Sequence, residues 1–135
     1  MKKIILIVAT ILLTVACSKD ENEPTVPNPL IGTWEWVDTL DYGDGNIHIT
    51  TLTHTYNSNW TFNHSQLEEL NGSVDKQESV SGTYSIQDKD KVKWTVIAII
   101  EQSVILPFRK GQDEKGEYLI YVFDIFGDSD KYYKK

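Results

Sequence analysis

The sequence has a single cysteine, Cys17, which excludes an internal disulfide and a cysteine-rich zinc site. Positive charge is scarce as well. There are 13 lysine and arginine residues against 20 aspartate and glutamate residues, and the formal net charge is -7. A nucleic-acid binder needs a basic surface to neutralise phosphates, so this class is disfavoured. With 135 residues, the chain has room for one domain.

Motifs for catalysis are also missing. The sequence contains no G-x-S-x-G motif and no phosphate-binding loop. Its neighbouring carboxylates, Glu68-Glu69, Asp88 with Asp90, and Asp113-Glu114, fall in hydrophilic segments where water solvates them. His48 and His54 would share a strand face, but solvent-facing strand histidines are commoner than metal ligands. We therefore expect no catalytic residue, no cofactor and no metal site.

The N-terminus has the pattern of an export signal. Lys2 and Lys3 precede an apolar run over residues 4–16, and these 13 residues are too few to cross a bilayer, which needs about 20. Cys17 follows directly. This stretch resembles the lipobox of bacterial lipoproteins, which implies that residues 1–16 are a signal peptide and that Cys17 carries diacylglycerol and an acyl chain such as palmitate. The alternative is an ordinary secretory signal followed by a free cysteine.

A tether is predicted between Cys17 and the folded body. Residues 18–29 hold three of the four prolines, a composition typical of an extended, disordered spacer, so we place the tether at 17–29 and the domain at 30–135. Residues 18–21, Ser-Lys-Asp-Glu, resemble the surface-export signal of Bacteroidetes lipoproteins. A solvated acidic start to the tether is the alternative. The resemblance implies a lipid anchor in the outer membrane of the cell envelope, with the periplasmic or the cell-surface face left open.

The body has the composition of a β domain. Residues 30–135 contain 26 β-branched residues and one alanine, Ala98. We predict strands near 32–40, 46–55, 57–63, 65–71, 73–86 (with an interruption at Gly82), 92–100, 103–109 and 117–126, and a short ninth around Tyr132. Residues 64–70 are the only candidate for a helical turn. The expected fold is all-β: an antiparallel meander closed as a barrel of about eight strands, with a β-sandwich as the alternative.

Gly32-Thr33-Trp34 opens the first predicted strand as a G-x-W motif. Together with residues 59–63, 81–86 and 92–95, it resembles lipocalins and the compact lipocalin-like domains of Bacteroidetes lipoproteins. The resemblance implies that Trp34 packs across the closed end of an eight-stranded barrel. The arginine that stacks on this tryptophan in lipocalins has no clear counterpart, because the only arginine is Arg109.

The aromatic residues are the remaining candidates for a functional site. Most are expected in the core, because aromatics fill the interior of small barrels. Some of them are candidates for a ligand-binding mouth: Trp36, Tyr56, Trp60, Tyr84, Trp94 and Tyr121. We expect binding of a small apolar or amphipathic ligand. The alternative is a structural or protein-interaction lipoprotein whose barrel is filled by its own side chains.

Overall fold

The computed structural model describes residues 27–97, 100–123 and 127–135. The predicted signal peptide, Cys17 and most of the predicted tether lie outside these residues. The described chain is built from strands: β1 (Gly32–Asp41), β2 (Ile47–Tyr56), β3 (Thr61–Leu70), β4 (Ser73–Gln87), β5 (Lys91–Ile97), β6 (Glu101–Asp113), β7 (Gly116–Phe123), β8 (Gly127–Asp128) and β9 (Tyr132–Lys134).

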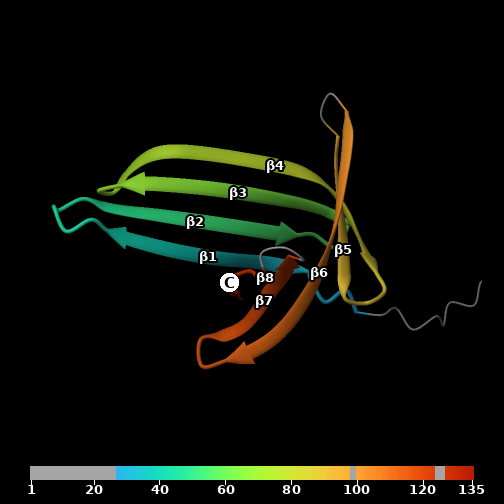
Figure 1. Ribbon diagram of the computed structural model, residues 1–135. Coiled ribbons are helices and arrows are strands. Elements are labelled where there is room, and N and C mark those ends of the chain that lie inside the picture. The colour runs from blue at the N-terminus through green and yellow to red at the C-terminus, as the bar shows by residue number, and fades with distance from the viewer. Residues whose placement is uncertain (1–26, 98–99, 124–126) are drawn as a thin grey trace, which may run out of the picture.

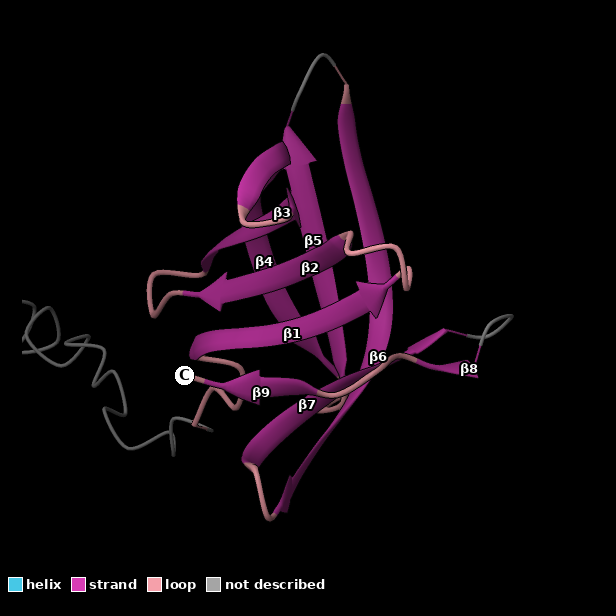
Figure 2. Ribbon diagram, turned by 90° about the vertical axis from the view of Figure 1, so that its left-hand side faces the viewer, coloured by secondary structure: helices cyan, strands magenta, loops and turns pink. Residues whose placement is uncertain are grey.

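The strands form one antiparallel meander that closes on itself. Each strand from β1 to β7 pairs with the next, and the short β9 lies between β1 and β7 and completes the ring. Figure 1 shows β1 to β4 running side by side as long strands, with β5 and β6 standing across them. Figure 2 shows β9 at the closure. The all-β fold class and the closed antiparallel meander are confirmed.

The ring is closed unevenly. β1 pairs with β2 along its whole length, but it meets β9 only through Trp34 with Lys134 and Glu35 with Tyr133. β7 meets β9 only through two pairs as well. The molecule is therefore tightly closed at the end that holds β9 and open at the other end, and it is not an even barrel.

The strand prediction was wrong between residues 57 and 71. The structure has one strand, β3, where two were expected, and residues 64–70 are extended instead of helical. The turn lies at residues 57–60, where Trp60 adopts a φ of 63°. A left-handed backbone is rare for a bulky residue, so no local pattern indicates it. β4 is likewise continuous through Gly82, and β6 runs on to Asp113.

The closed end holds the core. Its fully buried members include Leu30, Trp34 and Leu119, and the indole Nε1 of Trp34 donates a 2.7 Å hydrogen bond to the Leu30 carbonyl oxygen. The ammonium groups of Lys110 and Lys134 lie over the Trp34 ring, at 5.1 and 5.7 Å from its centroid. Lysines thus supply the cations over this ring. The absence of a side chain at Gly32 leaves room for this packing, since a Cβ there would lie 3.3 Å from Lys134 Cε.

The concave face becomes more polar toward the open end. Register places three successive rows of residues across β1 to β4: Trp34, His54, His64 and Val80; Trp36, Leu52, Gln66 and Glu78; Asp38, Thr50, Glu68 and Lys76. Because side chains alternate along a strand, each row faces the same side of the sheet as the buried Trp34. The sequence pattern thus produces an apolar closed end and a charged rim.

Candidate functional site

An apolar groove lies on the concave face, between β3 and β4 on one side and β5 and β6 on the other. It has a volume of about 330 Å³ and is lined by Phe62, His64, Val80, Trp94, Val96, Gln102, Ser103 and Val104. Val80 and Val104 remain 38% and 44% exposed. This apolar groove is therefore an accessible surface and not part of the sealed core.

A hydrogen-bonded network fixes Trp94, one of the residues that line the groove. Its indole Nε1 donates to the Tyr56 hydroxyl at 2.9 Å, and the hydroxyls of Tyr56 and Tyr121 are 2.7 Å apart. The Trp94 ring also stacks on Phe62, with centroids 5.7 Å apart and an interplanar angle of 26°. Burial raises the pKa of both tyrosines, so their hydroxyls stay neutral. Trp94 is thus held in place before any ligand arrives.

A pair of histidines sits beside this network. The Nδ1 atoms of His54 and His64 are 3.2 Å apart across the β2–β3 pair. Burial, with a smaller contribution from His64, lowers the pKa of His54 to about 3, and burial also lowers the pKa of His64. Both imidazoles are therefore uncharged at neutral pH.

The proton positions of the pair follow from burial. His54 Nε2 is buried and has no hydrogen-bond partner among the described residues. An unpaired buried acceptor is tolerated more readily than an unpaired buried N–H, so we assign the His54 proton to Nδ1, where it is donated to His64. His64 then carries its own proton on Nε2, as the donor that it can offer to a ligand.

A polar hollow continues the groove toward the open end. It has a volume of about 440 Å³ and is lined by His64, Gln66, Glu78, Ser79 and Val80. Because His64 and Val80 line both spaces, the apolar groove and the polar hollow are contiguous. Together they offer an apolar surface at one end and charged groups at the other.

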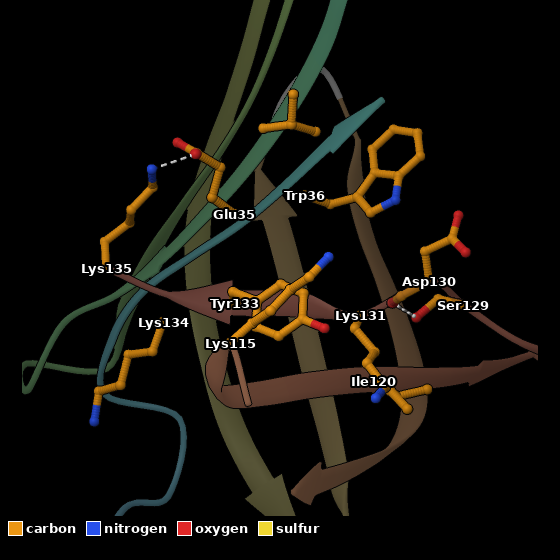
Figure 3. Close-up of a pocket in the computed structure, with 11 residues that line it drawn as sticks. Glu35, Trp36, Lys115, Ile120, Ser129, Asp130, Lys131, Tyr133, Lys134 and Lys135 are labelled. Carbon is orange, nitrogen blue, oxygen red and sulfur yellow. Dashed lines mark hydrogen bonds and ion pairs between the residues drawn. The ribbon is translucent and has the colours of Figure 1, made fainter. Parts of the chain in front are cut away.

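A wider hollow of about 830 Å³ lies at the seam between β1, β7 and β9 (Figure 3). Lys115 lies across the Tyr133 ring, with its Nζ 5.7 Å from the ring centroid, and Trp36 stands at the rim. Three other lysines of this hollow are held by carboxylates: Lys131 by Asp113, Lys134 by Glu117 and Lys135 by Glu35. Its cations are largely neutralised, and its lining is about as polar as it is apolar, whereas the lining of the groove is mostly apolar.

The structure separates the six candidate ligand residues into four places. Only Trp94 lines the apolar groove. Tyr56, Tyr84 and Tyr121 are 2%, 4% and 1% exposed, and they belong to the core. Trp36 lies at the seam hollow, and Trp60 is 47% exposed on the β2–β3 turn, where it packs against Tyr84.

Sequence reasoning missed most of the groove. Val80, Val96 and Val104 look like ordinary strand residues, and His64 falls in the segment considered for a helical turn. Their meeting depends on register, since Trp94 pairs with Val104 and His64 pairs with Val80. Alternation along correctly bounded strands would have placed them on one face, but it would not have shown that this face stays open.

No family model, no curated protein and no solved structure matches this chain. Across residues 27–97, 100–123 and 127–135, no helix is long and apolar enough to span a membrane. In the same part of the chain, no three histidine, cysteine, aspartate or glutamate side chains gather into a metal-binding group.

Proposed function

We propose that this chain is a lipid-anchored protein of the bacterial envelope whose β domain binds a small apolar or amphipathic molecule in the apolar groove. The observation that carries the binding role is an accessible apolar surface with a fixed aromatic ring, Trp94, on its wall. Ligand sites in proteins are concave, mostly apolar and formed in advance, and their volumes start near 300 Å³. His64, Gln102 and Ser103 add the few polar groups that orient a ligand.

The anchoring role rests on the N-terminal sequence alone. Lys2, Lys3, the apolar run and Cys17 have the order expected of a lipoprotein signal, and more than one acyl chain holds a protein stably on a bilayer. The compact lipocalin-like class is supported by the G-x-W motif at Gly32–Trp34, whose tryptophan lies buried at the closed end. A binding role is proposed in preference to a catalytic one, because His64 is the only titratable group among the described residues that line the groove.

Binding of the uncharged dye Nile red tests the proposal. We expect saturable fluorescence enhancement with the full chain, and we expect Val80→Trp to abolish it by filling the groove. Val74→Trp is the matched control, because Val74 lies on the same strand, is 61% exposed and does not line the groove. An absence of binding, or an equal loss in both variants, would contradict the proposal.

One observation favours the filled-barrel alternative. The closed half of the interior is occupied by the tyrosine network, so the ligand space is confined to the open half. If no apolar probe binds the native protein, the same concave surface is better explained as a contact for a protein partner.

A further inference from the structure

The polar hollow carries more negative than positive charge. Glu78 lines it, and Lys76 Nζ lies 3.1 Å from the Glu78 carboxylate and 3.9 Å from that of Glu68 in the next row. Two carboxylates, Glu68 and Glu78, therefore share one ammonium group, which leaves a negative excess beside the hollow.

From this arrangement we infer that the groove selects an amphipathic ligand with a cationic head group, such as an amine. Its apolar body would lie against Trp94 and Val104, and its head would lie in the polar hollow beside Glu78. This inference rests on the proposed ligand-binding function and goes further by naming the charge of the ligand.

The other head groups fit less well. A carboxylate would enter a region that already holds an excess of carboxylates, and the cation beside it, Lys76, is engaged by Glu78 and Glu68. His64 offers no compensating charge, because burial lowers its pKa and keeps it neutral. An uncharged hydroxyl can accept a hydrogen bond from His64, but it gains nothing from the carboxylates. The preferred order is thus amine, alcohol, carboxylate.

The size of the preference is limited by water. The Glu78 side chain is 63% exposed, and exposed charges interact weakly and are screened by salt. We expect a difference of about tenfold between cationic and anionic ligands at low ionic strength. The difference should shrink as salt is added.

The experiment compares three probes that share one ten-carbon chain: decylamine, decanol and decanoate. Their dissociation constants are measured on the full chain by displacement of Nile red at neutral pH and low salt, below the concentration at which the probes self-associate. Decylamine should bind about tenfold more tightly than decanoate.

Two charge variants of opposite sign separate this inference from a folding defect. Glu78→Gln should reduce the preference for decylamine, and Lys76→Gln should increase it. Glu101→Gln is the control, because Glu101 precedes the groove residue Gln102 on β6 and faces the opposite side of the sheet. It should leave the preference unchanged.

The outcomes distinguish the two claims. If none of the three probes displaces the dye, and the dye itself does not bind, the proposed function fails. If the probes bind but decanoate binds as tightly as decylamine, the ligand-binding function stands and the inference about charge is overturned. It is also overturned if Glu78→Gln and Lys76→Gln shift the preference in the same direction.

Discussion

Among the described residues, His54 is the one buried polar side chain other than the tyrosines. It is 4% exposed, and its ring lies within 5.5 Å, centroid to centroid, of the rings of Trp94, Tyr121 and Tyr132. A charged imidazole in this position would lose its water without gaining an anionic partner. Protonation of His54 therefore destabilises the folded domain relative to the unfolded chain.

This effect predicts a loss of stability in weak acid. The pKa of His54 falls from 6.5 in the unfolded chain to about 3 in the folded one, so the unfolded state binds more protons between these values. The free energy of unfolding should be highest above pH 6.5 and should fall as the pH drops, by up to about 1.4 kcal/mol for each pH unit.

Urea unfolding of the full chain between pH 7 and pH 5 would measure this slope. His54→Phe keeps an aromatic ring in the site and removes the titrating group, so its slope should be smaller than that of the native protein. Identical slopes for the two proteins would show that His54 is not the acid-sensitive residue.

At the scale of elements, β4 is the strand that shapes the groove. It pairs with β3 as far as Thr83 and with β5 from Thr83 onward, so it passes from one side of the groove to the other. Gly82 lies at this crossing. A Cβ there would come within 2.2 Å of the Thr95 carbonyl oxygen and 2.9 Å of the Phe62 ring. The glycine is needed for close approach of β5 and not for a break in the strand.

We therefore predict that Gly82→Ala destabilises the domain by about 1–3 kcal/mol, the usual cost of forcing extra atoms into a packed site. Gly111→Ala is the comparison, because the three atoms nearest to a Cβ at Gly111 all belong to the far end of the Tyr118 side chain, which can move aside. The midpoints of urea unfolding should rank native, Gly111→Ala and Gly82→Ala in descending order. A Gly82→Ala midpoint at or above that of Gly111→Ala would refute the close-approach argument.

At the scale of the whole molecule, the two ends of the ring have different roles. The closed end contains the core, which includes Leu30, the residue at which the predicted tether ends. The apolar groove lies along β3 to β6, and the polar hollow continues it toward the open end. A lipid at Cys17 would thus attach the domain through its closed end and leave the groove accessible.

The lipid itself is predicted to be present on Cys17. Mass spectrometry of the protein from its native cells should show cleavage before Cys17 and an added diacylglycerol and acyl chain. Cys17→Ser should remove both modifications and release the protein from the membrane fraction. Ser18→Ala, which keeps the cysteine, should behave as the native protein. A free thiol at Cys17 or a retained Met1 would contradict the prediction.

The types of neighbouring residues in the sequence were enough to predict the class of fold and several turns. β-branched residues predicted strands because their stiff side chains suit a pleated sheet. The turns at residues 42–46 and 71–72 follow from Asn, Asp and Gly, which accept left-handed backbone, and Gly43, Gly45, Asn71 and Gly72 all have positive φ. The turn that ends at Trp60 was missed because a tryptophan gives no such signal.

Only the tertiary structure decided which aromatic residues are buried in the core and which remain accessible to a ligand. Tyr56, Tyr84 and Trp94 look equivalent in the sequence, yet the two tyrosines are sealed in the closed end and Trp94 lines the groove. The difference arises from uneven closure, because β9 joins β1 to β7 over only two residue pairs on each side. Residues that are neighbours in the sequence do not determine how far β9 pairs with β1 and β7, nor that His64 pairs with Val80. Both features depend on the register of strands that meet only when the chain has folded.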